Sequence, residues 1–176
     1  MPVKEKELRK QLLALLQGGN SHMDVDDAVA DLPPDKINAK TRSTPYSIWH
    51  ILEHMRIAQR DILDFITDPA HVSPDFPDGY RPRADIRADE TLWNRTLDRF
   101  RADLKAFQKM VKDPETDLFS DIPHAPGYTI FRELLLVADH NAYHIGEIAM
   151  LRQELDAWPP DAPYLTGEGS AEPDSL

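Results

Sequence analysis

Long stretches without helix-breaking residues are the feature that most limits what this chain of 176 residues can fold into. Most of its prolines lie in four clusters, at 33–45, 69–82, 114–126 and 159–173. Between the clusters, apolar residues recur at steps of three and four, as in Trp93, Leu97, Phe100, Leu104, Phe107 and Val111. That spacing places them on one face of a helix. No useful run alternates with period two, so we expect helices and no strands.

The same pattern locates the individual helices. We expect long helices at about 4–17, 46–66, 89–112 and 130–157, and a short one at about 24–32. Pro45 suits the start of the second long helix, and Thr129 suits the N-cap of the last. Leu8, Leu12, Leu15 and Leu16 mark the apolar face of the first helix. The last helix is apolar over most of its circumference, which indicates burial on more than one side.

These elements predict an all-α fold, a four-helix bundle with an additional short helix and long proline-rich connections. The length fits one domain, which we place at residues 1–158. Residues 159–176 form a polar tail rich in helix breakers, which we expect to be poorly ordered.

Composition excludes several classes of function. The chain has 31 acidic against 20 basic residues, a net charge of -11, so no nucleic-acid partner is expected. It has no cysteine, which excludes disulfides, protein thiolates and cysteine-ligated metals. No apolar run approaches the ~20 residues of a membrane span, and the charged N-terminus does not resemble a signal peptide. We therefore expect a soluble, cytoplasmic protein without a membrane partner.

Histidines are the residues most suggestive of chemistry. The chain has seven: His22, His50, His54, His71, His124, His140 and His144. Two pairs, His50 with His54 and His140 with His144, are spaced i, i+4. Imidazoles one helical turn apart can bind the same metal ion. The alternative is that each ring is an ordinary surface histidine or a hydrogen-bonded core histidine, and spacing alone does not decide between them.

Helical-wheel positions refine the choice of histidines. At ~100° per residue, His54 falls about 60° from the centre of its helix's apolar arc and His50 about 100° from it. His144 lies on the apolar side of the last helix, and His140 lies about 40° further round. Three histidines on two helices thus point toward an interior. If they hold a metal, three neutral imidazoles leave a position open for water or substrate, which is typical of catalytic sites.

Nearby carboxylates could support such a site, because a ligating imidazole usually donates its second N–H to an acceptor. Glu53, Asp139 and Glu147 are the candidates. Glu147 lies one turn from His144, so it could also be a ligand, a general base or simply a solvated carboxylate.

Two segments resemble signatures of the DinB/YfiT-like superfamily. One is PYSIWHILEHMRIAQ, residues 45–59, and the other is ADHNAYHIGEI, residues 138–148. Their order and separation also fit, and the resemblance spans about residues 4–158. It implies a four-helix bundle with a non-sequential helix arrangement. It also implies a divalent metal held by His54, His140 and His144, with His50 as the fallback ligand.

The resemblance further implies zinc or nickel as the metal, with iron or manganese as other options, and a homodimer. Some members of the superfamily transfer low-molecular-weight thiols, isomerise thiol adducts or act as hydrolases, and many have no assigned activity. We therefore expect a metal-dependent thiol S-transferase or small-molecule hydrolase, whose small-molecule substrate is not identified. The alternative is a non-catalytic metal-binding or stress-related bundle protein. The connections at 69–88 and 113–128, the second containing His124, could cover a substrate.

Overall fold

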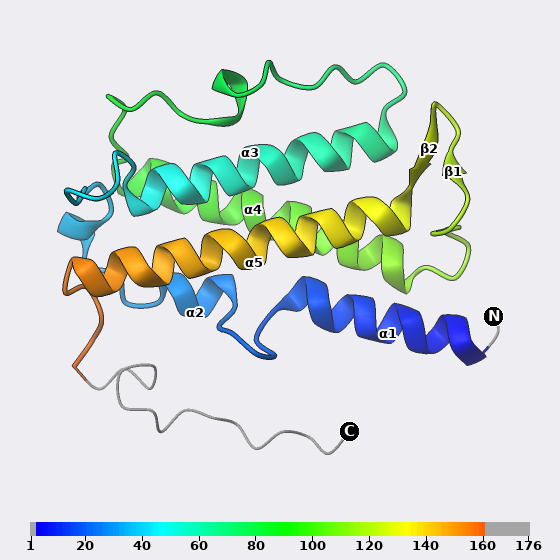
Figure 1. Cartoon of the computed structure of the whole chain (residues 1–176), viewed down its shortest axis with the longest axis horizontal. Helices are drawn as coiled ribbons and strands as arrows, with labels where there is room; N and C mark the ends of the chain where they lie inside the picture. Colours follow the sequence, from blue (N-terminus) through cyan, green and yellow to red (C-terminus); the bar gives the residue numbers. More distant parts are fainter. Residues whose placement is uncertain (1–2, 161–176) are drawn as a thin grey trace.

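The computed structural model describes residues 3–160 of the chain, and its five α-helices confirm the predicted all-α bundle (Figure 1). The helices are α1 (Val3–Gln17), α2 (Val25–Val29), α3 (Ile48–Thr67), α4 (Glu90–Lys112) and α5 (Ile130–Glu154). Two short 3-10 helices, η1 (Pro34–Lys36) and η2 (Asp78–Tyr80), and two strands, β1 (Asp121–Ile122) and β2 (Ala125–Thr129), complete the elements. Most of the expected polar tail, from residue 161 onward, lies outside the described residues.

The helices are not arranged in chain order. α3 packs against α4 and α5, and α1 packs against the same two helices, so α1 and α3 occupy opposite corners of the bundle. The short α2 continues the row of α1 and packs on α5 (Figure 1). α5 therefore contacts three other helices, which accounts for part of its apolar circumference, whereas Leu135, Leu136, Tyr143 and Met150 remain exposed.

Hydrogen bonds between helices show their relative directions. Trp49 Nε1 donates to Thr96 Oγ1, and further along both helices Gln59 Nε2 donates to the Phe100 carbonyl, so α3 and α4 run parallel. Asn141 Nδ2 on α5 donates to Gln59 Oε1. Because α4 starts beside the start of α3, the chain must return about 30 Å, the length of α3. The proline-rich segment 68–89, which we call the crossover, makes this return (Figure 1).

Side-chain caps set where the long helices begin. Ser47, Asp89 and Thr129 each accept a hydrogen bond from the backbone N–H three residues on. These bonds satisfy N–H groups that have no partner within the helix. Thr129 is the cap predicted from the sequence. The start predicted for the second long helix is two residues early, because Ser47 is the cap and Pro45 precedes it.

The buried face of α1 differs from the predicted one. Leu12 and Leu16 are buried, but Leu8 and Leu15 are about half exposed. Arg9 takes the remaining buried position, and its guanidinium donates to the carbonyls of Val111, Asp113 and Thr116. A cation can replace an apolar residue here because it satisfies the backbone carbonyls at and just beyond the end of α4.

The expectation of no strands is wrong at residues 121–129. β1 and β2 form a small antiparallel hairpin, in which Asp121 pairs with Thr129 and Ile122 with Ala125. Strands this short provide too few positions for a period-two pattern to be visible in the sequence. His124 lies in the turn, and its Nε2 is 2.7 Å from the Phe65 carbonyl near the end of α3.

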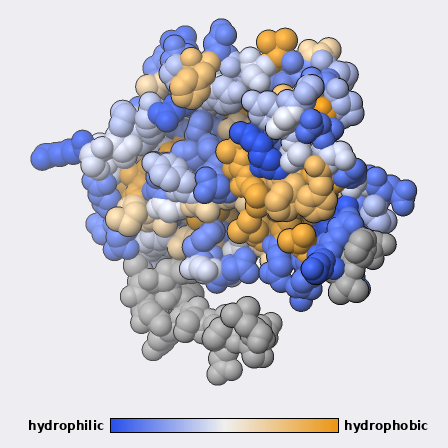
Figure 2. Space-filling model, turned by 45° about the vertical axis from the view of Figure 1, so that its right-hand side comes forward, coloured by the Kyte–Doolittle hydropathy of each residue, from blue (hydrophilic) through white to orange (hydrophobic). Residues whose placement is uncertain are grey.

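Apolar side chains also reach the surface. Figure 2 turns the β-hairpin end of the molecule forward and shows apolar side chains gathered in one patch. Along α5, Leu136, Tyr143 and Met150 are exposed at seven-residue intervals. The homodimer stays a prediction.

Among the helices within residues 3–160, none is both long enough and apolar enough to cross a membrane.

Candidate metal centre

Three histidine side chains converge between α3 and α5. His54 comes from α3, and His140 and His144 lie one turn apart on α5. Nε2 of His140 is 3.1 Å from Nε2 of His54 and 3.1 Å from Nε2 of His144. Within the described part of the chain, this is the group of histidines and carboxylates whose ligand atoms lie close enough together to hold a metal ion. The structure therefore brings together the three residues that the resemblance implies.

Hydrogen bonds on the outer side of two rings fix their tautomers. His54 Nδ1 lies 2.7 Å from the carbonyl oxygen of Tyr80, and His144 Nδ1 lies 2.6 Å from Oε2 of Glu147. Both partners only accept, so each Nδ1 carries the proton and donates it. In a neutral ring, the inward-facing Nε2 then carries a lone pair, the form that ligates a metal.

Hydrogen bonds among the three converging nitrogens cannot satisfy all of their lone pairs. If His54 and His144 present lone pairs, His140 Nε2 can donate its proton to only one of them. At least one of the two Nε2 contacts at 3.1 Å is then not a hydrogen bond, and a shared cation would satisfy the lone pair that it leaves without a donor. Zinc ligands at 2.0–2.1 Å in tetrahedral geometry lie about 3.4 Å apart. The spacing and the donor set therefore fit a divalent metal.

The surroundings also favour the neutral form of two of these imidazoles, His140 and His54. Burial, with smaller effects from His144 and His54, lowers the pKa of His140 from 6.5 to about 4. Burial is also the main reason that the pKa of His54 lies below its ordinary value, with smaller lowering contributions from His144 and Arg81. A neutral imidazole is the ligating form, so these shifts favour metal over proton near neutral pH.

The crossover holds His54 in place from outside α3. Tyr80, whose carbonyl accepts from His54, donates through its own hydroxyl to Oδ2 of Asp61 at 2.7 Å. The other oxygen of Asp61 lies 2.6 Å from Nε2 of His71. One carboxylate on α3 thus binds two side chains of the crossover. The sequence could not identify Tyr80 as a support, because a backbone carbonyl leaves no residue-type signal.

Other candidate residues take different roles. His50 is not part of the group: its Nδ1 lies 2.7 Å from Ser47 Oγ and its Nε2 lies 3.2 Å from the Arg83 carbonyl. Both ring nitrogens are therefore occupied. Glu53 receives bonds from Arg56 and Thr96 and supports none of the three histidines. Asp139 is exposed, and only Glu147 of the three proposed carboxylates supports a ring.

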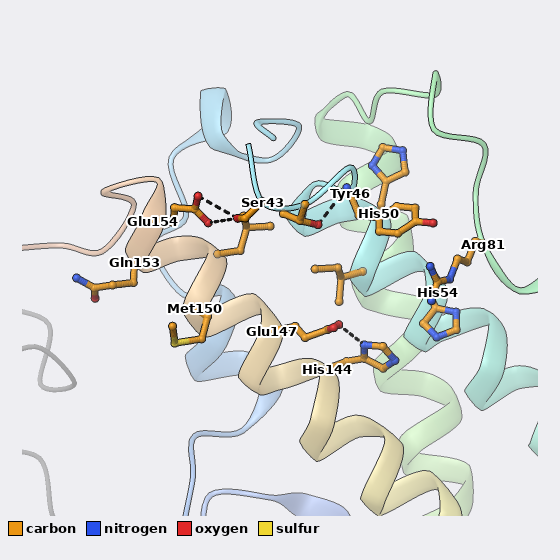
Figure 3. A pocket seen from close by; sticks show the side chains of 13 residues that line it. Ser43, Tyr46, His50, His54, Arg81, His144, Glu147, Met150, Gln153 and Glu154 are labelled. Carbon is orange, nitrogen blue, oxygen red and sulfur yellow. Dashed lines mark hydrogen bonds and ion pairs between the residues drawn. The ribbon is translucent and has the colours of Figure 1, made fainter. Parts of the chain in front are cut away.

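A pocket of about 580 Å³ opens beside the histidines (Figure 3). Its lining combines His54, His144 and Glu147 with apolar residues such as Ile51 and Met150. Trp49 does not line it, because that side chain is buried in the core, and neither does Tyr143. Of the two connections expected to cover a substrate, only the crossover contributes a lining residue, Arg81. The hairpin connection packs near Phe65, about 16 Å along α3 from His54.

Comparison with known proteins gives one match. The sequence model of the DinB superfamily matches residues 19–148, which include all three converging histidines. No curated protein and no solved structure matches the chain.

Removing any of the three histidines should abolish tight metal binding. Loss of an outer supporting residue alone typically costs about 10–100-fold in affinity, so losing a ligand should cost more than about 100-fold. We expect zinc titration of wild-type protein to saturate at about one ion per chain, and His54→Ala, His140→Ala and His144→Ala to show no such binding. His50→Ala is the matched control, one turn earlier on α3; it removes a bond to the Arg83 carbonyl of the crossover but no ligand, so it should weaken zinc binding by no more than about tenfold. Equal loss in His50→Ala would contradict the assigned ligand set.

Asp61 should affect metal affinity without touching the ligands. Asp61→Asn weakens the bonds to Tyr80 and His71 that hold the crossover against α3, so His54 should lose part of its orientation. We expect about a tenfold weaker zinc affinity, at the lower end of outer-residue effects, measured by chelator competition. Asp85→Asn removes an exposed carboxylate whose ion pair within residues 3–160 is with Arg83, on the same crossover, and should have no effect. Unchanged affinity in Asp61→Asn would show that the crossover does not position His54.

Proposed function

The chain belongs to the DinB superfamily, and from its site we propose that it is a metal-dependent enzyme acting on a small molecule. The observation that carries this proposal is that three Nε2 atoms converge beside an open pocket while two rings are held from outside. Structural zinc sites are normally closed by four protein ligands, whereas catalytic sites use three and keep one position open. Within residues 3–160 this group offers three ligands.

The proposed chemistry is activation of a nucleophile in the pocket. A divalent ion held by three imidazoles supplies Lewis acidity, which lowers the pKa of a water or thiol bound at the open position. We propose zinc or nickel, since both bind imidazole well, and the superfamily resemblance also admits iron or manganese. The chain has no cysteine, so a thiol nucleophile must come from a small-molecule cosubstrate.

We assign Glu147 two tasks. Its Oε2 accepts the Nδ1 proton of His144 and so orients that ring. Its Oε1 has no hydrogen-bond partner within the described residues, and the side chain lines the pocket. This oxygen is placed to accept the proton that a thiol or water releases when it becomes a nucleophile.

Two reactions share this chemistry: S-transfer from a low-molecular-weight thiol to an electrophile, and hydrolysis of a small ester or amide. In the first, the thiol sulfur forms a new bond to carbon as the leaving group departs. In the second, water loses a proton and attacks the carbonyl carbon, and the bond from that carbon to the alcohol oxygen or amine nitrogen breaks as the leaving group takes up a proton. We propose thiol transfer or hydrolysis as the activity, and comparative assays on one preparation distinguish them.

The test compares Glu147→Gln with wild type. Glutamine can still accept from His144 Nδ1 through its amide oxygen, but it cannot take up a proton. Zinc- and nickel-loaded proteins are assayed for thiol conjugation of 1-chloro-2,4-dinitrobenzene and for hydrolysis of 4-nitrophenyl acetate. We expect one activity in the wild type, at least about 100-fold reduced in Glu147→Gln, in the range of general acid–base effects. Metal content measured in parallel should be similar in both proteins.

Glu154→Gln is the control, because Glu154 lines the same pocket two turns away and binds Ser43. It should keep full activity. Activity that survives metal removal would contradict the proposal. Absence of both activities, together with a large drop in melting temperature on metal removal, would indicate the non-catalytic alternative, in which the metal stabilises the fold.

A further inference from the structure

Among the described residues that line the pocket, Arg81 is the only lysine or arginine. Arg83, two residues later, pairs with Asp85 at 2.6 Å, but Arg81 has no carboxylate partner within residues 3–160. Its guanidinium carbon lies 4.8 Å from the centre of the Tyr46 ring. Stacking on a ring face holds the cation in place while leaving its N–H groups free to donate.

The position of Arg81 follows from the support of the metal centre. The preceding residue, Tyr80, is held to α3 twice, by the bond from His54 Nδ1 to its carbonyl and by the bond from its hydroxyl to Asp61. The next residue along the chain must therefore lie beside His54. Figure 3 shows Arg81 there, on the same side of the pocket as His54.

Most other polar groups of the pocket already have partners. Ser43 binds Glu154, His50 uses both ring nitrogens, and His144 binds Glu147. The hydroxyl of Tyr46 has no hydrogen bond among the described residues, so it is a second free donor near Arg81. The free donors of the pocket thus include one guanidinium and a neighbouring phenol.

We infer that the pocket takes a small molecule that carries a carboxylate, and that Arg81 binds this carboxylate while the reacting group lies at the histidines. The inference rests on the proposed function, because that proposal identifies the neighbouring histidines as the metal centre where the reaction occurs. A guanidinium matches a carboxylate in charge and in its two parallel hydrogen bonds. A phosphate dianion fits the protein side chains less well, because Arg81 is the one cationic side chain among the described lining residues, which also include Glu147 and Glu154.

The test measures binding and does not require turnover. The probes are 4-phenylbutyrate and 4-phenylbutan-1-ol, which share a phenyl group for the apolar wall at Ile51, Met150 and Leu151 and differ in the carboxylate. Dissociation constants are measured on the full chain, with and without saturating zinc. We expect the carboxylate to bind about tenfold more tightly than the alcohol, the order of a charge-assisted hydrogen bond.

Arg81→Gln should remove this preference, and Arg81→Lys should keep part of it. Arg87→Gln is the matched control, an exposed arginine on the same crossover that does not line the pocket, and should behave as wild type. The Nε–H resonance of Arg81 should shift on titration with 4-phenylbutyrate and not with the alcohol. Zinc affinity, measured in each variant, checks that the site is intact.

Equal binding of the two probes by wild type would overturn the inference. A preference that persists in Arg81→Gln would also overturn it, and if that preference appears only with zinc present, the carboxylate binds zinc. The result of this binding test can be distinguished from the result of the activity assays. Arg81-dependent binding in a protein without either activity would leave the carboxylate site standing and reject the enzyme. Activity without a carboxylate preference would support the enzyme and reject the carboxylate site.

Discussion

The hydrogen bond from His54 Nδ1 to the Tyr80 carbonyl links the architecture of the bundle to its chemistry. Because α3 and α4 run parallel, the chain must return along the whole length of α3 before α4 can begin. A return segment of this length could lie anywhere on the surface. Asp61 ties it to α3 at Tyr80 and His71, and the segment then fixes the tautomer of one proposed metal ligand and places Arg81 in the pocket.

Two of the three histidines are positioned by a single helix, whereas the third depends on how two helices pack. His140 and His144 lie one turn apart on α5, a helix that contacts three others, so their relative position is set by helical geometry. His54 reaches the same point only if α3 and α5 keep their antiparallel register, which the bond from Asn141 to Gln59 supports in the buried interior. Three inward-facing nitrogens with few protons to share are costly without a cation, so metal binding should favour the register that brings them together.

The sequence predicted much of this and failed for identifiable reasons. Helix periodicity and breakers located the five α-helices, and Thr129 was recognisable as a cap because its residue type and position suffice. The helical wheel favours His54 over His50 and the family resemblance implies the same choice, while in the structure both ring nitrogens of His50 have other partners. The hairpin could not be predicted from the sequence, because its strands are too short to show a period-two alternation of apolar and polar residues. Tyr80 was missed because its contribution is a backbone atom, and the role of Asp61 requires a contact between residues far apart in the chain.

In the proposed centre three imidazoles, and no further protein ligand, surround a metal with an open position. X-ray absorption spectroscopy of the zinc-loaded full-length protein tests this most directly. We expect the first coordination shell of the zinc to contain three imidazole nitrogens at about 2.0–2.1 Å and one ligand from solvent. The solvent ligand should be replaced when a small thiol is added. Fewer than three imidazoles, or a shell closed by a fourth protein ligand that no added thiol displaces, would contradict the proposed centre.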